Sequence, residues 1–372
     1  MRVVFIDHYS GASSLHKEPI TIPAALAARG HDVSLASVNE WQGSLAGLRT
    51  ERLSHWQADL SGPRRADAVV AITRFDSSLT PTLRVLKRHD IRVIVKGDTD
   101  GTLGFPVTPN YLRARPLGAN PINVLRHLKW RLPLRAILRP RLEQIMLADL
   151  VVAESPGAIV NLAEVLQHWG HVGSIPKLRF IPNPVSPAVT TRPLKTDKTR
   201  TIVSAGRWDD NVKGGDLLRA TIERAVDSGS QYTFLIIGNG GKEIYGKLRS
   251  DCRRFVECPG PLDFDATQEA ISKSRILLVT SLLESFSFVA AEALSSGTSL
   301  VVTPIESLVY LAGGGAYGSI ARKFSVAAIT AALLNEIREW DQGNRTPSSI
   351  SSYWRPKLNI EVVSELWDKA LR

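Results

Sequence analysis

The sequence predicts an α/β protein built from two doubly wound parallel sheets. Short apolar runs with the length of strands alternate with helical segments along most of the 372 residues. The runs are continuous rather than alternating in polarity, as expected for strands that are covered on both faces. The alternation stops at a proline-rich turn, Ile181–Val185, and then restarts. At about 100–200 residues per domain, the length also fits two domains.

The first half is expected to hold five strands and four helices. Gly30 is expected to end the first of these helices as its C-cap, a position that glycine favours. The expected strands are Val3–Ile6, Val33–Ala36, Ala68–Ile72, Arg92–Val95 and Leu150–Ala153, and the expected helices are Pro19–Arg29, Leu79–Arg88, Arg141–Leu147 and Pro156–Gln167.

The second half repeats the pattern, and the chain ends in a helix, Tyr353–Arg372. Domain boundaries of 1–183 and 184–352 follow from the turn. Two doubly wound sheets facing each other form a cleft, and ligands bind beyond the carboxyl ends of such strands. The expected strands are Thr201–Ala205, Tyr232–Ile237, Ile276–Thr280 and Leu300–Val302, and the expected helices are Gly215–Asp227 and Val289–Leu294.

Composition narrows the class of protein. Two cysteines exclude a disulfide framework and a Cys-rich zinc site. No run reaches the length of a membrane-spanning helix, and the apolar start is too short for a signal peptide, so we expect a cytoplasmic protein. The 46 basic and 36 acidic residues leave a charge of +10. Residues 101–142 contain eight cations and no acid, which indicates that this stretch binds an anionic surface or an anionic substrate.

The clearest motif is Glu284-Ser285-Phe286-Ser287-Phe288, followed by Glu292 in the next helix. The motif follows a strand, so it brings a helix N-terminus to the edge of the sheet. The unpaired N–H groups and the positive dipole end of such a helix favour phosphate. The second glutamate is suited to accept hydrogen bonds from the two hydroxyls of a ribose. Two surface glutamates beside an ordinary helix are the alternative interpretation.

Two upstream loops favour the functional interpretation. Arg207 and Lys213 lie in the loop after a strand, and two cations at this spacing can hold a diphosphate. The next strand ends at Gly238 and Gly240, where glycine permits close backbone approach to a ligand. Each feature alone is typical of an ordinary surface loop, whereas their order along the chain is specific.

In this order the motifs resemble those of glycosyltransferases with the GT-B fold, and in particular the retaining family four, the glycosyl transferases group 1. The resemblance is close from Ile181 to Val302 and looser in the first half. It implies that the second domain binds a nucleotide sugar and the first an acceptor, that the sugar is transferred with retention, and that the C-terminal helix 353–372 crosses back onto the first domain. It implies no metal and no other cofactor.

The resemblance also implies roles for individual residues. Arg207 and Lys213 would hold the donor diphosphate, with Glu284 beside the donor sugar; these three are the expected catalytic residues. Glu292 would bind the ribose. The remaining expected donor-binding residues are Gly238, Gly240, Pro261 and Leu262 around the nucleobase and Ser285, Phe286, Ser287 and Phe288 around the sugar and phosphate.

The chain departs from the family pattern at three places. Ser287 stands where glycine usually follows the phenylalanine, Ser299 replaces a common proline, and a single glycine, Gly11, replaces a pair after the first strand.

The expected acceptor side of the first domain includes Asp7, His8, Gly11, Asp98 and Asp100, which follow strands. Asp98-Thr99-Asp100 has the D-x-D form of a metal motif. We expect a turn or an acceptor contact there instead, because the phosphate-binding loops lie in the other half. A structural role is the alternative for His8.

The basic stretch 101–142 has two interpretations. Arg131, Arg135 and Arg139 recur every four residues beside Trp130, Leu134, Leu138 and Leu142. Such a helix can lie on an anionic membrane, at the inner face of the cell membrane, with a lipid-linked or otherwise anionic acceptor. The alternative is a solvated helix packed on its own domain.

The expected donor is a UDP-sugar first and a GDP-sugar second, and the acceptor is a glycan, a glycolipid or a small molecule. A sugar-nucleotide epimerase and a non-catalytic nucleotide-sugar-binding protein are the alternatives. Nucleic-acid binding is disfavoured because no such module is present. A dinucleotide oxidoreductase is disfavoured because no G-x-G-x-x-G follows the first strand.

Overall fold

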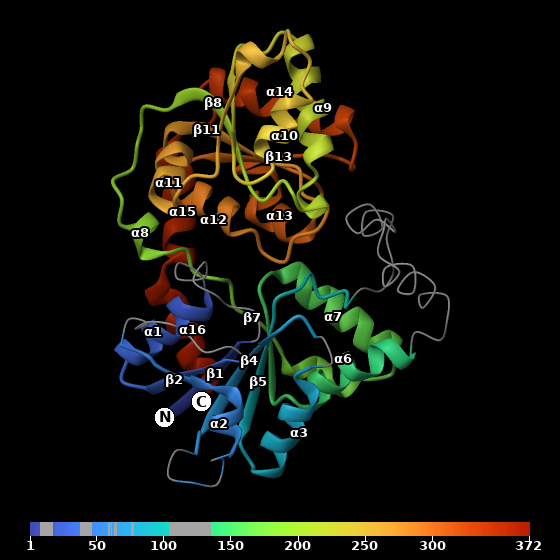
Figure 1. The fold of residues 1–372 in the computed structure, drawn as a ribbon, viewed down its shortest axis with the longest axis vertical. Helices are drawn as coiled ribbons and strands as arrows, with labels where there is room; N and C mark the ends of the chain where they lie inside the picture. The colour runs from blue at the N-terminus through green and yellow to red at the C-terminus, as the bar shows by residue number, and fades with distance from the viewer. Residues whose placement is uncertain are drawn as a thin grey trace. The chain divides into compact units, whose positions relative to one another are not determined.

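A computed structural model describes residues 1–7, 18–37, 47–58, 60, 62, 65–75, 78–103 and 135–372. In these residues the chain divides into two compact units (Figure 1). One unit holds a sheet of seven strands in the order β3-β2-β1-β4-β5-β6-β7, and the other a sheet of six strands in the order β10-β9-β8-β11-β12-β13. All strand pairs are parallel. The predicted fold class, two doubly wound α/β sheets, is confirmed.

The first unit contains the strands β1 (Arg2–Asp7), β2 (Asp32–Ser37), β3 (Arg49–Arg52), β4 (Ala68–Thr73), β5 (Arg92–Gly97), β6 (Leu150–Ala153) and β7 (Leu178–Phe180). Its helices are α1 (Glu18–Ala28), α2 (Leu53–Ala58), α3 (Thr80–Arg88), α6 (Arg135–Leu147), α7 (Pro156–His168) and α16 (Ile360–Leu371). The sheet is covered on both faces, as its apolar strands require.

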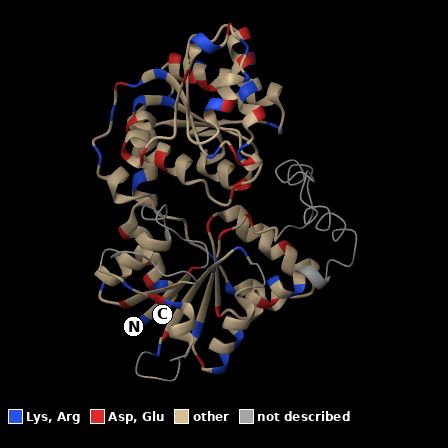
Figure 2. Cartoon of the chain, viewed as in Figure 1, with Lys and Arg blue, Asp and Glu red and all other residues tan. Residues whose placement is uncertain are grey.

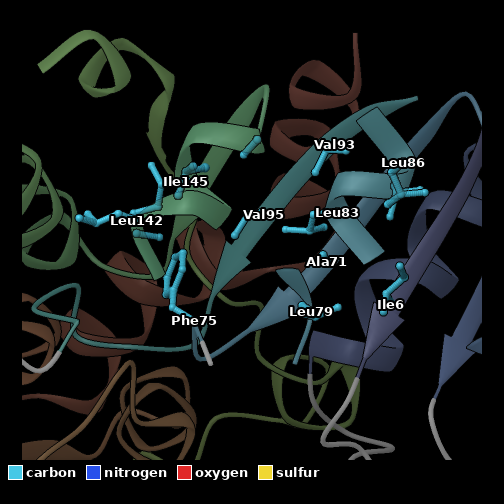
Figure 3. Packing of buried hydrophobic residues seen from close by; sticks show 14 of the residues in the cluster. Ile6, Ala71, Phe75, Leu79, Leu83, Leu86, Val93, Val95, Leu142 and Ile145 are labelled. Atoms are coloured by element: carbon cyan, nitrogen blue, oxygen red, sulfur yellow. The ribbon is translucent and has the colours of Figure 1, made fainter. Parts of the chain in front are cut away.

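Alternate residues of the strands supply two separate cores. On one face, Val4, Ile6, Ala71 and Val95 pack with residues of α3, α6 and α7. Figure 3 shows α3 and α6 projecting Leu83, Leu86, Leu142 and Ile145 onto this face. On the other face, Val3, Phe5 and Val70 pack with α1 and α16, where Trp367 is fully buried.

The C-terminal segment was predicted as one helix from Tyr353, which is wrong in one respect. It forms two helices, α15 (Pro347–Leu358) and α16, which are separated at Asn359. Asn359 interrupts the helix because its side chain accepts a hydrogen bond from Glu361 N at 2.8 Å, as an N-cap does. Helix α16 packs on α1, and His31 Nε2 lies 2.9 Å from Asp368 Oδ1.

The second unit contains β8 (Thr199–Ala205), β9 (Thr233–Ile237), β10 (Val256–Gly260), β11 (Ser274–Val279), β12 (Ser299–Val302) and β13 (Gly318–Ile320). Its helices are α8 (Pro187–Thr190), α9 (Gly215–Asp227), α10 (Gly241–Gly246), α11 (Phe264–Lys273), α12 (Phe288–Ser295), α13 (Glu306–Leu311), α14 (Val326–Asp341) and α15. Helix α9 packs beside α14, and α11 packs beside α12.

Four strands were not among those predicted: β3, β7, β10 and β13. They are only 4, 3, 5 and 3 residues long. They also lack a continuous apolar run, since β3 reads RTER and β10 contains a proline. All four lie at or next to an end of a sheet, where neighbouring strands rather than their own composition determine the pairing.

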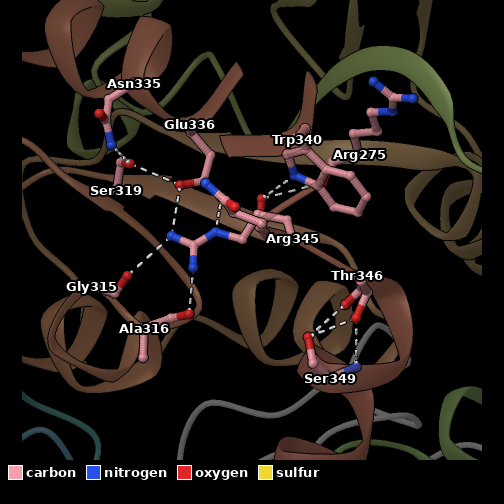
Figure 4. A network of polar contacts seen from close by, with 12 residues as sticks. Arg275, Gly315, Ala316, Ser319, Asn335, Glu336, Trp340, Arg345, Thr346 and Ser349 are labelled. Atoms are coloured by element: carbon pink, nitrogen blue, oxygen red, sulfur yellow. Dashed lines mark hydrogen bonds and ion pairs between the residues drawn. The ribbon is translucent and has the colours of Figure 1, made fainter. Parts of the chain in front are cut away.

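A buried ion pair ties the edge of the second sheet to α14 (Figure 4). Arg345 Nε donates to Glu336 Oε1 at 2.8 Å, and the Glu336 side chain is fully buried. The same guanidinium donates to Ala316 O at 2.6 Å and Gly315 O at 3.1 Å, while Ser319 Oγ donates to Glu336 Oε2 at 2.8 Å. Strand β13 and the glycine loop before it are thereby fixed to the helix.

Glu336→Ala should therefore destabilise the second unit by about 3–5 kcal/mol, because it leaves the Arg345 guanidinium without its buried partner. Arg219→Ala, which breaks the more exposed pair with Glu223 on α9, is the matched control and should cost about 0.5 kcal/mol or less. Urea unfolding followed by tryptophan fluorescence measures both. Equal losses in the two variants would contradict the structural role of the buried pair.

Candidate functional site

The loops of the expected donor site begin at the point where the strand order of the second sheet reverses. Strand β8 pairs with β9 on one side and with β11 on the other, so the loops after β8 and β11 leave in opposite directions. Ligands of open parallel sheets bind at such a point. Residues 206–214 follow β8, and residues 280–287 follow β11.

The two loops are joined by hydrogen bonds to the backbone carbonyls of the first loop. Leu282 N donates to Val212 O at 2.7 Å, and Thr280 Oγ1 donates to Lys213 O at 3.0 Å. Gly214 takes a left-handed conformation with φ +68°, and a Cβ there would lie 2.2 Å from Thr280 O. Only glycine permits this approach, which places Lys213 directly beside the β11 loop.

Lys213 and Glu284 are brought into contact. Lys213 Nζ lies 2.6 Å from Glu284 Oε1, and Ser281 Oγ donates to the same oxygen at 2.7 Å. The Glu284 side chain is 10% exposed and that of Lys213 is 21% exposed, so the pair is largely buried but still accessible to a ligand. An anion binding at Lys213 would therefore meet an ammonium group that is already oriented by a carboxylate.

Arg207 lies in the same loop but is more open. Its side chain is 74% exposed, and its nearest acidic neighbour is Asp210, with 3.9 Å between Nη2 and Oδ2. The loop backbone itself is held, since Trp208 N donates to Asn239 O at 2.7 Å and Trp208 Nε1 donates to Ile237 O at 2.9 Å. Arg207 thus extends from a fixed backbone into solvent.

Gly238 and Gly240 are required by packing between loops. Gly238 has φ +120°, and a Cβ there would lie 1.9 Å from Gly206 O; Gly240 has φ +76°, and its Cβ would lie 2.5 Å from Asp209 N. The close approach predicted for these glycines is thus an approach to the β8 loop. Gly238 N also donates to Gly260 O at 2.9 Å, which brings the end of β10, with Pro261 and Leu262 after it, beside this loop.

Ser287 occupies the N-cap position of α12 in an unusual backbone conformation. It has φ +74°, one of few non-glycine residues with positive φ in the part of the chain that the structure describes. Its side chain makes no capping hydrogen bond, and its buried Oγ has no partner among the described residues. The first turn of α12 is therefore not capped by a side chain, and the backbone at this position is strained. Phe286 is buried beside Phe288, with 5.6 Å between ring centroids.

The other end of α12 is held by cations. Arg355 Nε donates to Ser295 O at 2.6 Å, and Lys198 Nζ donates to Ser296 O at 2.9 Å. Lys198 also donates to Ser272 O and Thr298 Oγ1, and burial lowers its pKa to about 7. These contacts fix the carboxyl ends of α11 and α12 to each other and to the start of β8.

Glu292 lies in the middle of α12 and contacts α11. Gln268 Nε2 donates to Glu292 Oε2 at 2.7 Å. Neither Gln268 nor Ser281 was among the predicted site residues. Ser281 follows a strand end, a position that could have drawn attention to it. Gln268 shares the buried face of α11 with Ile271 and Ser272. A polar residue at such a core position is the feature of the sequence that could have identified it.

A cavity of about 720 Å³ lies beside these loops. It is bounded by the β8 loop and by α9 and α10, including Trp208, Asp216, Gly240 and Lys247. None of Arg207, Lys213, Glu284 and Glu292 lines it. The cavity and the predicted donor residues are therefore adjacent, and they share Gly240.

The acceptor-side residues of the first unit are partly described. Asp7 is buried at the end of β1, whereas His8 and Gly11 lie outside the described residues. Asp98 Oδ2 accepts a hydrogen bond from Arg74 Nε at 3.0 Å. Asp100 Oδ1 accepts from Thr102 N at 3.0 Å and from Thr102 Oγ1 at 2.8 Å, which makes it a turn-forming residue.

A buried ion pair not predicted from the sequence lies near these residues. Lys96 on β5 pairs with Glu154, which follows β6, and both side chains are 1% exposed. Burial raises the pKa of Glu154 and Asp98 adds to this effect, whereas Lys96 opposes it. Among the residues that the structure describes, no group of three His, Cys, Asp or Glu side chains could hold a metal ion.

For the leucines of α6, the structure favours the second of the two interpretations, packing on their own domain. Leu138 and Leu142 on α6 are buried in the core of the first unit, at 1% and 4% exposure. This face therefore packs on its own domain. Most of the basic stretch, including Trp130, Arg131 and Leu134, lies outside the described residues. Elsewhere Lys and Arg lie among Asp and Glu on the helices of each unit (Figure 2). Within the described ranges, every helix is too short or too polar to span a bilayer.

The second half of the chain resembles a known protein family. Residues 199–338 match the family model of glycosyl transferases group 1. A stretch of 145 residues is 28% identical to the phosphatidyl-myo-inositol mannosyltransferase of Mycolicibacterium smegmatis, covering 38% of this chain and 37% of that protein. The alignment thus spans little more than a third of the curated relative's length.

Solved structures resemble the whole chain. Sucrose-phosphate synthase from Thermosynechococcus elongatus matches with a TM-score of 0.71 and 16% identity over 99% of this chain and 98% of that one. HepE from Anabaena in complex with UDP matches with a TM-score of 0.72 and 13% identity over 100% and 99%. The fold is GT-B. The match to the glycosyl transferases group 1 over residues 199–338 agrees with the predicted family and with the predicted enzyme class, glycosyltransferase (EC 2.4).

Ser287→Gly should stabilise the second unit by about 1 kcal/mol or more, because glycine adopts positive φ without strain and the orphaned hydroxyl is removed. Ser287→Ala is the matched control, since it removes the hydroxyl and keeps the strain. The difference between the two variants in urea unfolding isolates the backbone contribution. Equal stability of both variants would contradict the strain at this residue.

Proposed function

We propose that the protein transfers a hexosyl group from a nucleoside diphosphate sugar to an acceptor, with retention of anomeric configuration. The observation that carries the proposal is the contact between Lys213 and Glu284 from two neighbouring loops, next to the first turn of α12. The arrangement combines a cation, a carboxylate and N–H groups without a side-chain cap at one edge of the sheet.

Each predicted donor residue has a physical role in this proposal. Arg207 and Lys213 bind the diphosphate and stabilise its charge as the bond to the sugar breaks. The N-terminus of α12 adds its dipole to the same phosphates. Glu284 lies beside the sugar, and Glu292 accepts hydrogen bonds from the ribose. Residues 238–240 and 260–262 flank the base.

UDP-sugars are the proposed donors and GDP-sugars the second choice. The similar fold of HepE was solved with UDP and with UDP-glucose, which supports a uridine nucleotide for this fold. The first unit, with Asp7, His8, Gly11, Asp98 and Asp100, is the proposed acceptor side, and residues 1–183 and 184–352 remain the proposed domains.

Arg207→Ala and Lys213→Ala should each lower turnover about 100-fold or more, because each removes a preorganised charge from the leaving diphosphate. Both should also reduce the rise in melting temperature that UDP or GDP causes in the unaltered enzyme. Lys247→Ala, a lysine of the neighbouring cavity, is the control. The proposal fails if both site variants keep the turnover of the unaltered enzyme. Product NMR at the anomeric proton tests retention.

We further propose that the enzyme works on an anionic membrane surface with a lipid-linked or otherwise anionic acceptor. The support is the charge of residues 101–142, eight cations without an acid. Since Leu138 and Leu142 are buried, the attraction would be electrostatic and not an apolar insertion by that face.

Cosedimentation with vesicles tests this proposal. Vesicles with an anionic lipid should retain the protein at low salt and release it at high salt, while neutral vesicles should not retain it. Replacing Arg113, Arg115 and Arg126 by serine should weaken retention, whereas the same change at three exposed arginines of the second unit (Arg207 excluded) should have less effect. Equal partitioning into both vesicle types would overturn the proposal.

A further inference from the structure

We propose that Gln268 is a positioning residue that sets the Glu292 carboxylate for a pair of vicinal ligand hydroxyls and so makes the site selective for ribonucleotide over deoxyribonucleotide donors. The inference deepens the proposed function and depends on it. It starts from a single contact, Gln268 Nε2 to Glu292 Oε2 at 2.7 Å, which joins α11 to α12.

The chemistry of the contact fixes the orientation of the amide. An ionised carboxylate only accepts hydrogen bonds, so the NH₂ of Gln268 must face Glu292. Its carbonyl oxygen is then directed elsewhere, and Oε1 is buried without a partner among the described residues. Gln268 is 1% exposed. A buried amide with one unpaired atom is unfavourable for folding, and an apolar residue would fill this core position without that penalty.

The neutral character of Gln268 matters for the ligand. A lysine or arginine at this position would orient Glu292 equally well and would also neutralise it. An amide donor holds the carboxylate and leaves its negative charge in place, and hydrogen bonds to a charged acceptor are the stronger ones. Each carboxylate oxygen can accept more than one hydrogen bond, so Oε2 keeps capacity while it is bound to Gln268.

The surrounding helices make this orientation rigid. Gln268 lies on the buried face of α11 with Ile271 and Ser272. Lys198 fixes the carboxyl ends of both helices through Ser272 O and Ser296 O. Glu292 itself is only half-buried, so a ligand can reach it. A carboxylate held in this way can accept from two adjacent hydroxyls at once, whereas a free side chain would first have to be ordered.

The test compares binding of UDP with 2′-deoxyuridine diphosphate, and of GDP with 2′-deoxyguanosine diphosphate, by calorimetry. The unaltered enzyme should prefer the ribonucleotide of the base it binds by about tenfold or more, as expected for a hydrogen bond to a charged acceptor. Gln268→Met keeps the volume and loses the donor, and it should reduce the preference to about threefold or less. KM for the ribonucleotide donor should rise accordingly while kcat changes little.

Controls separate positioning from a general loss of structure. Gln231→Met changes an exposed glutamine of the same unit and should leave the preference intact. Gln268→Glu places a like charge against Glu292 and should weaken ribonucleotide binding more than methionine does. Adding Gln268→Met to Glu292→Gln should change the preference no further, because the two residues act as one unit.

The outcomes distinguish this inference from the function on which it rests. If Gln268→Met keeps the full preference for the ribonucleotide, the positioning role is wrong and the donor site stands. If the unaltered enzyme binds ribo- and deoxyribonucleotides equally, both the ribose assignment of Glu292 and the role of Gln268 are wrong. A loss of the preference in Gln231→Met as well would show that the effect is not specific to the contact, and would also overturn it.

Discussion

The parallel pairing of β11 with β8 is the constraint on which the candidate site depends. Ile276 lies beside Ile202 and Leu277 beside Val203, so the two strands end at the same edge of the sheet. Because their connections leave in opposite directions, the loops that carry Lys213 and Glu284 meet there although 71 positions separate them in sequence. The left-handed glycine at 214 and the Leu282–Val212 hydrogen bond then hold the two loops in close contact. Neither could create it without the strand order.

The sequence predicted those parts of the fold that are marked by continuous apolar runs or by the turns that interrupt them. The central strands of both sheets are continuous apolar runs, and each was predicted within a few residues. The short outer strands were not, because RTER in β3 and GSI in β13 have no pattern of their own. The helix after Tyr353 was predicted as continuous because Asn359 acts through a cap, a local hydrogen bond that periodicity does not reveal.

The candidate site was predictable where the residues stand in a motif and unpredictable where they act across helices. Glu284, Ser287 and Glu292 occur within nine positions of one another, so their order could be read directly. Gln268 acts on Glu292 from another helix, and only the polarity of a core position marks it. The apolar face of α6 could not be assigned from the sequence, since leucines beside arginines suit a membrane interface and a domain core equally. The burial of Leu138 decides between the two.

The two ends of α12 explain how a strained site can persist in a stable unit. At its amino end Ser287 has positive φ and makes no capping bond, which is unfavourable for folding and leaves the first turn without a side-chain cap. At its carboxyl end the carbonyls of Ser295 and Ser296 accept hydrogen bonds from Arg355 and Lys198, which also complement the negative end of the helix dipole. The helix is thus held where no ligand is expected and left open where phosphate is expected. A side-chain cap at Ser287 would stabilise the helix by bonding its first N–H groups. The same cap would compete with a phosphate for those groups, so its absence keeps them available to a ligand.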